Sequence, residues 1–423
     1  MAIHHADIGG LSPGSLPLST SLFQEGIIIS PVRLVRNDRL QLEIIELICT
    51  NSRTPHERKG DLLAQIAANE TGIRRVTSLA EHYGVNALQA AADSTIGYSE
   101  RMVRQTLKGV PEGCYFAVDS LEPGISSHGV PDNGAQICAS VTVNADGSIV
   151  FDFTGTSIQM RGSLNATEAI TRSACYYVVR CLVDDDIPTN EGCFGPVTVI
   201  APAGTVVNAG SGAAVAGGNV ETSQRIVDTV LRALAAAVPN RVPADSQGTM
   251  NNVTIGGWDP FRNRTFAYYE TIGGGSGATS ATDGFSGIQC HMTNTRNTPV
   301  ESLESHYPLK VEQYSIREDC VKNGRRSGGA GIVRRIKMLV SCEVSVLSER
   351  RHIAPHGLSG GGDGQCGQNI WICSDGAVEK MPARFTRSAC AGDVLEIRTP
   401  GGGGYGDIDE TTSEPAAAAA SHI

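Results

Sequence analysis

Clustered glycine sets the strongest limit on how this chain can fold. The 423 residues include 49 glycines, gathered in short runs such as 273–277 and 401–404, without the three-residue period of collagen. Apolar residues make up 40% of the chain and charged residues 18%. That is enough apolar material for several cores, so disorder over most of the length is excluded. Glycine runs between such segments predict tight loops inside folded domains and exclude flexible linkers.

The apolar pattern changes along the chain from helical to β-rich. Helices are predicted at 61–69, 76–83, 87–107, 173–183 and 221–238, after a helical face at 40–48 and with Gly84 as a stop. Strands are predicted at 114–121, 137–143, 148–153, 197–200, 205–208, 252–256, 338–347 and 370–373. We expect an α+β, mixed multi-domain fold with a helical N-terminal part and a β-rich C-terminal part with Gly-rich loops.

Four regions follow from this pattern. They are an N-terminal loop and helical region (1–110), an α/β middle region (111–245), a β-rich C-terminal region (246–408) and a disordered tail (409–423).

Charge and cysteine usage exclude several classes of function. The formal net charge of -10, without a Lys/Arg run, argues against a nucleic-acid partner. No stretch approaches the ~20 apolar residues that cross a bilayer, so no membrane association is expected. The twelve cysteines are scattered and form no C-x-x-C pair, and the first residues do not resemble a signal peptide. A cytoplasmic protein with reduced thiols is therefore expected.

The N-terminal segment His4-His5-Ala-Asp7 is the first candidate site. Imidazole and carboxylate within four residues can share a divalent metal, or one can orient the other. The alternative is an N-terminus with incidental histidines, because two histidines and one aspartate do not complete a metal site.

Two glycine-rich segments could present backbone N–H groups to an anion or substrate. They are 270–277, with Glu270, Gly274 and Gly275, and 399–406. Neither matches a P-loop or a Rossmann fingerprint, so no nucleotide site is expected in this chain. The alternative, to which we give about twice the weight, is tight turns between strands.

The segment 290–304 is unusually polar, with His291, Asn294 and Arg296 close together. Polar groups at this density need partners if they are buried, so the segment predicts either a solvated loop or a polar site. Asp61, Gln65 and Asn69 form a further polar row along a helix, for which a solvated face is the simpler interpretation.

Seven motifs in register give a resemblance over nearly the whole chain. They are His4-His5-Ala-Asp-Ile-Gly-Gly10, Asn51-Ser-Arg-Thr-Pro55, Gly60-Asp-Leu-Leu-Ala-Gln-Ile-Ala-Ala-Asn69, Asp152-Phe-Thr-Gly-Thr-Ser157, Asn190-Glu-Gly192, Asn294-Thr-Arg-Asn-Thr-Pro-Val-Glu301 and Pro400-Gly-Gly-Gly-Gly-Tyr-Gly406. Together they resemble the hydantoinase B (N-methylhydantoinase) family, which is related to the C-terminal part of 5-oxoprolinase and to the alpha chain of acetone carboxylase.

The resemblance implies a division of labour between two kinds of chain. A hydantoinase A-type partner is expected to bind ATP and phosphorylate the substrate amide, in a hetero-oligomer. This chain would hold a divalent metal (Mn, Zn or Mg) through His4 and Asp7, whose bound water would attack. Asp7, His5 and His291 are the predicted catalytic residues. The family also has an upstream Gly-Gly-Thr-His-x-x-Asp segment with further ligands, and this sequence lacks a match to it, as in an N-terminally truncated chain.

We therefore expect one component of an ATP-dependent cyclic amidase that opens a hydantoin, oxoproline or lactam ring. Two alternatives stay open at this point. One is a component of an ATP-dependent carboxylase of the acetone carboxylase kind, although the second histidine of the His-His-x-Asp motif resembles the hydantoinase branch more. The other is a catalytically inactive truncated remnant.

Overall fold

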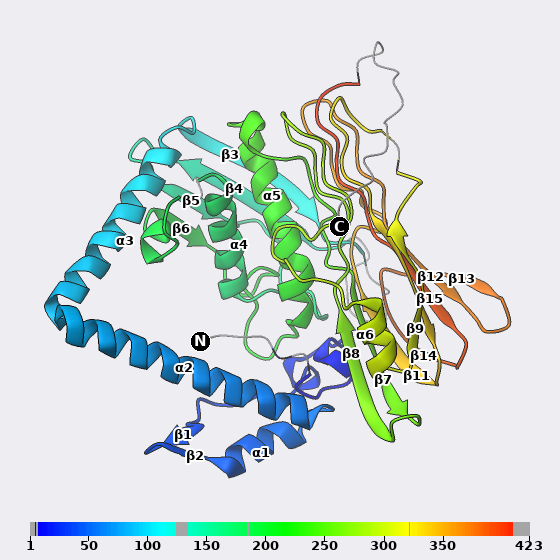
Figure 1. The fold of residues 1–423 in the computed structure, drawn as a ribbon. Coiled ribbons are helices and arrows are strands. Elements are labelled where there is room, and N and C mark those ends of the chain that lie inside the picture. The colour runs from blue at the N-terminus through cyan, green and yellow to red at the C-terminus, as the bar shows by residue number, and fades with distance from the viewer. Residues whose placement is uncertain (1–4, 6, 124–133, 184–185, 321, 409–423) are drawn as a thin grey trace.

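The computed structural model describes residue 5 and residues 7–123, 134–183, 186–320 and 322–408. The fold is α+β, as expected, with a projecting helical arm, a middle layer of sheet and helices, and a β-rich C-terminal part (Figure 1). The predicted tail at 409–423 lies outside the described residues. All twelve cysteines are free. Among the described helices, none is long and apolar enough to pass through a bilayer.

The N-terminal part is a loop followed by two long helices. Two short 3₁₀ turns (η1, Pro13–Ser15; η2, Leu22–Gln24) and a two-residue hairpin (β1, Val35–Arg36; β2, Arg39–Leu40) precede α1 (Leu42–Thr50). The helix α2 (Pro55–Tyr83) begins with a proline at its first position, and α3 (Val85–Leu107) follows at Gly84. Gly84 has φ 82°, so the predicted stop is confirmed. The separate helices predicted at 61–69 and 76–83 are one continuous helix.

The middle layer is a four-stranded sheet with two helices packed on it (Figure 1). Its order is β3 (Gly113–Ser120), β4 (Gln136–Val143), β5 (Ile149–Asp152) and β6 (Val197–Ile200), with only β5 and β6 parallel. A tight turn joins β4 to β5: Gly147 has φ 79° and its N–H donates to the carbonyl of Asn144. The strand predicted at 205–208 is wrong: Gly204 donates to the carbonyl of Asn208, which closes a turn.

The helices α4 (Glu168–Cys181) and α5 (Ser223–Ala235) bury their apolar faces in the largest core. A π-helical turn, η5 (Gly218–Thr222), begins the helix that the sequence predicted from residue 221. Short 3₁₀ turns lie at η4 (Glu191–Phe194) and η6 (Pro239–Arg241). Pro239, the first residue of η6, follows the end of α5.

The C-terminal part is built on two antiparallel sheets whose inner side chains form one apolar cluster. One sheet has the order β14 (Arg384–Ala389), β11 (Cys342–Leu347), β7 (Asn252–Asp259), β8 (Arg264–Glu270). The other has the order β13 (Val378–Met381), β12 (Gln368–Ile372), β15 (Val394–Arg398), β10 (Ile332–Met338), β9 (Leu309–Ile316). The short α6 (Val300–His306) precedes β9. The single strand predicted at 338–347 is wrong, because β10 ends and β11 begins within it.

The glycine runs are neither sharp turns nor open loops. Extended segments lie side by side beyond the ends of the sheets (Figure 1), joined by backbone hydrogen bonds from Gly402 to Gly329 (2.9 Å) and from Gly329 to Ser276 (2.9 Å). A Cβ on Gly275 would overlap the Gly329 carbonyl, and one on Gly402 would overlap the Ser276 carbonyl. Glycine is required here because whole backbones touch, so the interpretation as tight turns is wrong.

Candidate functional site

Asp7 is a buried anchor of the N-terminal loop. Its side chain is almost fully buried, with 1% exposed. Oδ1 accepts hydrogen bonds from the backbone N–H groups of Gly9 (3.1 Å) and Arg53 (3.0 Å) and from the Ser52 hydroxyl (3.2 Å). Oδ2 accepts from the Gly14 N–H (3.1 Å) and from the Arg53 guanidinium (3.3 Å). The carboxylate therefore ties the N-terminal loop to the connection between α1 and α2.

His5 lies against α2. Its Nδ1 is 2.6 Å from Nη1 of Arg58 and 3.8 Å from a carboxylate oxygen of Asp61, and its Nε2 is 3.1 Å from Nε2 of Gln65. Burial lowers the pKa of His5, the Arg58 charge lowers it further, and Asp61 opposes both. The imidazole is therefore neutral at pH 7. The polar row of Asp61 and Gln65, interpreted from the sequence as a solvated face, contacts this histidine instead.

The described residues do not by themselves form a metal site. Among them, no group of three or more His, Cys, Asp or Glu side chains is arranged to hold a cation. Both oxygens of Asp7 already accept hydrogen bonds, and a guanidinium cation faces Nδ1 of His5. His4, the predicted metal ligand, lies outside the described residues. A metal at Asp7 would have to displace hydrogen-bond donors, so the predicted ligand pair stays a prediction.

Three residues predicted to bind substrate or an anion have partners within the protein. Glu270 is buried in an ion pair with Arg334, at 2.9 Å between Oε1 and Nη2. The N–H groups of Gly274 and Gly275 donate to backbone carbonyl oxygens at 2.9 and 3.0 Å. An anion in this region would therefore need other donors.

Asn294 and Arg296 line a cavity of about 470 Å³. Tyr314 is part of its wall, and the Arg334 guanidinium lies 4.5 Å from the centre of the Tyr314 ring. Glu270, paired with Arg334, thus stands behind the wall. Of the residues predicted to bind substrate or an anion, Asn294 and Arg296 line this cavity, and Glu270 does not.

His291 lines an adjacent cavity of about 310 Å³, which shares Ile288 and Gln289 with the first. Its backbone has φ 58°, a conformation that few non-glycine residues adopt. The imidazole is held on both sides: Nε2 is 3.3 Å from Oδ1 of Asp228, and Nδ1 is 3.3 Å from the hydroxyl of Tyr177. Strain of this kind is often stored where a side chain must be aimed at a ligand.

The neighbours of His291 favour one protonation pattern. Burial raises the pKa of Tyr177, so its phenol stays protonated and can donate to Nδ1 of His291. On the other side, Nε2 lies at ion-pair distance from Oδ1 of Asp228, and neither of these two atoms has a hydrogen-bond partner among the described residues. Burial opposes the ionisation of Asp228, but its contacts with His291 and Arg350 outweigh burial and lower its pKa. A carboxylate, an imidazole and a phenol in series can accept a proton from the cavity and stabilise the resulting imidazolium.

Asp228 and Tyr177 were missed in the sequence. Asp228 lies in α5, which was recognised as an apolar helix, and Tyr177 lies in α4. The overlooked signal was the set of Arg225, Asp228 and Arg232 at helical spacing in a helix whose apolar stripe predicted burial, and in which twelve of thirteen residues are buried. Charged residues placed there need buried partners.

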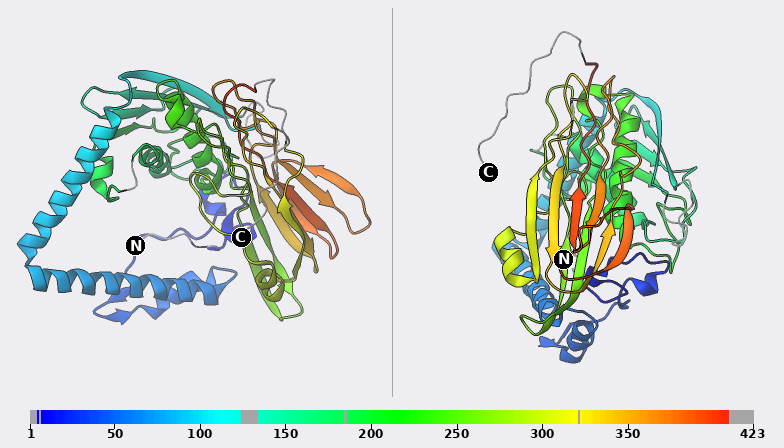
Figure 2. Two further views of the ribbon diagram at one scale, coloured as in Figure 1. Left: turned by 45° about the horizontal axis from the view of Figure 1, so that its top comes forward. Right: turned by 90° about the vertical axis from the view of Figure 1, so that its right-hand side faces the viewer.

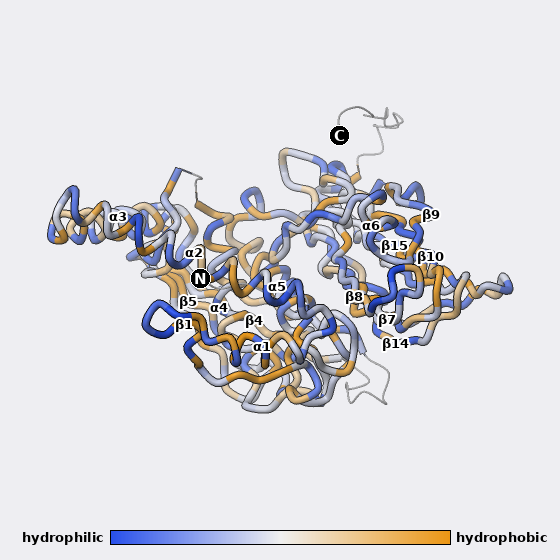
Figure 3. Tube along the Cα trace, turned by 60° about the horizontal axis from the view of Figure 1, so that its bottom comes forward, coloured by the Kyte–Doolittle hydropathy of each residue, from blue (hydrophilic) through white to orange (hydrophobic). Residues whose placement is uncertain are grey.

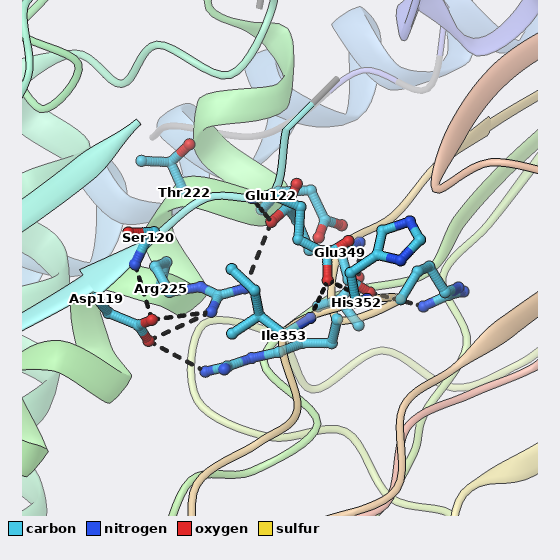
Figure 4. Close-up of polar contacts among 12 residues, drawn as sticks. Asp119, Ser120, Glu122, Thr222, Arg225, Glu349, His352 and Ile353 are labelled. Atoms are coloured by element: carbon cyan, nitrogen blue, oxygen red, sulfur yellow. Dashed lines mark hydrogen bonds and ion pairs between the residues drawn. The ribbon is translucent and has the colours of Figure 1, made fainter. Parts of the chain in front are cut away.

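Those partners form a network of buried charges between α5 and the end of β11 (Figure 4). We call it the charge junction; its members are Asp119, Glu122, Arg225, Asp228, Arg232, Asp245, Glu349, Arg350, Arg351 and Arg384. Nη2 of Arg350 lies 2.6 Å from Asp228, 3.1 Å from Asp245 and 3.4 Å from Asp119. Arg225 joins Asp119 to Glu349. The junction thus combines five carboxylates with five guanidinium groups.

The charge junction fixes Asp228, and through it His291. Burial alone would raise the pKa of Asp119, but Arg225, Arg350 and Arg232 hold it well below its usual range. The same carboxylates raise the pKa of Arg350 against the effect of burial. The pKa values of Asp119 and Asp228 are thus lowered, so Asp228 is presented to the imidazole as a carboxylate, whereas burial raises the pKa values of Asp245 and Glu349.

Comparison with known proteins gives a consistent family. The family model for hydantoinase B/oxoprolinase matches residues 1–408. The chain is 41% identical over 421 residues to 5-oxoprolinase 1 of Arabidopsis thaliana, covering 95% of this chain and 32% of that protein. It is 31% identical over 426 residues to the putative B component of a D-/L-hydantoinase from a Pseudomonas species, covering 97% and 70%.

A solved structure shows the same architecture. The ATP-dependent caprolactamase from Pseudomonas jessenii superimposes with a TM-score of 0.84 at 26% identity, covering 96% of this chain and 71% of that one. The chain spans about a third of the length of the plant oxoprolinase. On the match of the family model to nearly the whole sequence, this chain belongs to the hydantoinase B/oxoprolinase family.

Proposed function

We propose that this chain is the ring-opening component of an ATP-dependent cyclic amidase, working with a hydantoinase A-type partner that binds ATP. Family membership and the activities named for the relatives support this class of reaction. The observation that carries the proposal is His291, held between Asp228 and Tyr177 at a cavity beside the one lined by Asn294 and Arg296.

The chemistry begins with an amide made reactive by the partner. Phosphorylation of the amide oxygen removes the resonance that protects the ring. Water then adds to the amide carbon of the phosphorylated substrate. Tyr177 passes its proton to Nδ1 of His291 and takes one from the attacking water, while Asp228 stabilises the imidazolium. The proton held by His291 is then transferred to the nitrogen of the substrate ring. The second proton of the attacking water follows to the same nitrogen as the C–N bond breaks. The carboxyl phosphate that remains is hydrolysed to carboxylate and phosphate.

The residues of the larger cavity would orient the substrate. Arg296 and Asn294 supply a cationic and an amide group to its interior, and Glu270 orders the wall through Arg334. No step is assigned to a metal, because the described residues do not form a site for one. The roles of His4, His5 and Asp7 with a divalent metal stay predictions.

Co-expression with a hydantoinase A-type partner tests the proposal. We expect ATP-dependent ring opening of 5-oxoproline, hydantoin or caprolactam, followed as release of the open-chain product. His291→Gln should lower the rate of ring opening about 100-fold or more, because a general base contributes roughly 10² to 10⁴. His352→Gln, which changes an exposed imidazole, is the matched control and should leave the rate unchanged.

Two results would contradict the proposal. Full ring opening by the His291→Gln variant would remove this residue from the mechanism. Incorporation of labelled bicarbonate into a substrate, without ring opening, would instead identify a carboxylase. Tyr177→Phe gives a finer test: the rate should fall about tenfold and the pH profile should change, because the relay from water to Nδ1 is broken.

A further inference from the structure

The helical arm has its apolar side chains on the outside. The helices α2 and α3 project from the body and meet it only near their ends (Figure 2). The local core described for this part consists of Ile45, Cys49 and Leu62, with the partly buried Leu34 and Ile48 packed against it. Twelve large apolar side chains between residues 28 and 85 are exposed: Ile28, Ile29, Val32, Leu40, Leu42, Leu47, Leu63, Ile73, Val76, Leu79, Tyr83 and Val85. A surface of this kind normally has an occupant.

One face of α2 has the spacing of a helix-docking surface. Leu62, Ile66, Asn69, Ile73, Val76, Ala80 and Tyr83 recur at alternating steps of four and three residues, as in a coiled coil. We call this the α2 stripe. Its first residue is buried against α1, whereas Ile73 is 67% exposed, Val76 57% and Tyr83 63%. Figure 3 shows apolar positions recurring along the projecting arm.

Gly72 lies beside the middle of the stripe. A glycine inside a helix destabilises it relative to alanine. A Cβ added here would meet nothing within 4 Å, so no contact among the described residues requires glycine. A glycine at this position, next to the exposed Ile73, would allow another backbone to approach α2 closely.

The first described residue of the chain lies next to the start of the stripe. His5 contacts Arg58 and Gln65, on the side of α2 next to the first residues of the stripe. The Pseudomonas hydantoinase component and the caprolactamase chain are each longer than the region that matches this chain, which covers 70% and 71% of them. Of the positions that flank the exposed part of the stripe on α2 (70, 72, 77 and 79), only Glu70 is charged, so these flanks favour an apolar partner over an ionic one.

We infer that the α2 stripe docks an apolar helical segment of the polypeptide that the longer relatives carry outside the matched region. The segment would lie along α2 from Asn69 to Tyr83, beyond the part covered by α1, and would cross it near Gly72. The surface is distinct from the His291 cavity, and the inference holds or fails independently of the proposed chemistry.

The test uses the full chain and the unmatched regions of the Pseudomonas hydantoinase component, co-expressed as separate tagged polypeptides. We expect one of them to co-purify with the chain and to slow amide hydrogen exchange in residues 69–83. Ile73→Lys should weaken binding at least about tenfold, because a large apolar side chain leaves the contact. Ser78→Lys changes an exposed residue on the opposite face of α2 and is the control, expected to bind normally.

Three outcomes would overturn the inference. The first is equal binding by Ile73→Lys and the parent chain. The second is a homodimer, measured by light scattering, that protects 69–83 without any added segment and is lost in Ile73→Lys, since the occupant would then be a second copy. The third is unchanged exchange in 69–83 with every segment added. Circular dichroism of both variants establishes that α2 remains helical in each.

Discussion

The charge junction and the α2 stripe depart from the usual distribution of residues in opposite directions. The junction places ten charged side chains in or near the interior, whereas the stripe leaves large apolar side chains in solvent. The charges of the junction have partners within this chain: four of its carboxylates pair with guanidinium groups, and Glu122 accepts from the backbone N–H groups of His352 and Ile353. Some of its buried atoms, among them Oε2 of Glu122 and Nε of Arg350, have no hydrogen-bond partner in the described part of the chain. Of the stripe, only Leu62 belongs to a described apolar core. The buried charges of the junction are paired within the chain, whereas the exposed apolar face of the stripe points to a partner from outside it.

The two regions also differ in what they hold in place. Buried ion pairs are costly to desolvate, so the junction is better understood as a device that positions α5 against the end of β11 than as a source of stability. Its consequence is a fixed Asp228 beside His291. The exposed part of the stripe lies outside every described apolar core. We expect substitutions in the junction to lower the free energy of unfolding of the whole body. Substitutions in the stripe should change mainly the binding of its partner.

The largest effect should come from Arg350→Met. The change removes the cation shared by Asp119, Asp228 and Asp245 and leaves buried carboxylates uncompensated. We expect a loss of about 3–5 kcal/mol in the free energy of unfolding, measured by denaturant titration with the fluorescence of the buried Trp371. Arg172→Met, in an exposed pair with Glu168, should cost only a few tenths of a kcal/mol. Equal losses would mean that the junction is not structurally distinct.

A pH titration probes the edge of the junction. Burial is the main cause that raises the pKa of Glu221 to about 8, from its ordinary value of 4.5. The folded protein therefore holds a proton that the unfolded chain releases, and stability falls as the pH rises from about 4.5 to about 8. Glu221→Gln should remove on the order of 3 kcal/mol of this decline, measured as the difference between the two unfolding curves. Parallel curves would contradict a protonated Glu221.

The fold class and most helices and strands could be predicted because they depend on local patterns. The apolar stripe of α5 and the alternation in β7 are examples. The glycine segments could not, since nothing local distinguishes a glycine in a turn from one at which two backbones touch. For the candidate site, which stays a proposal, the polar density of the sequence pointed to His291 and Arg296. Asp228 and Tyr177 come from other helices, and their approach to His291 depends on how α4 and α5 pack.

Gly402→Ala tests whether the packed glycine segments behave like the junction. The added Cβ would overlap the carbonyl of Ser276, which is fixed by its own hydrogen bond from Gly329. We expect a loss of about 1–3 kcal/mol by overpacking, measured by denaturant unfolding. Gly60→Ala is the control, because Gly60 lies in α2 with open space around its Cβ position. Gly376 also has open space, but its φ of 92° would strain an alanine there. A loss at Gly60 as large as that at Gly402 would show that crowding is not the cause.

The smallest effect, and the one of opposite sign, should come from Gly72→Ala. In the isolated chain the new methyl group meets nothing, and alanine favours a helix interior over glycine by up to about 1 kcal/mol. Amide hydrogen exchange in α2 should therefore slow about two- to fivefold around residue 72, while unfolding of the body is unchanged. The same variant should bind the docking segment less well, because the methyl group stands where the partner backbone approaches. If the substitution stabilises the free helix and weakens its complex, Gly72 is needed for docking and does not serve only to make α2 flexible. If Gly72→Ala slowed exchange and left binding intact, the glycine would have no role in docking, and only the apolar spacing would still argue for it.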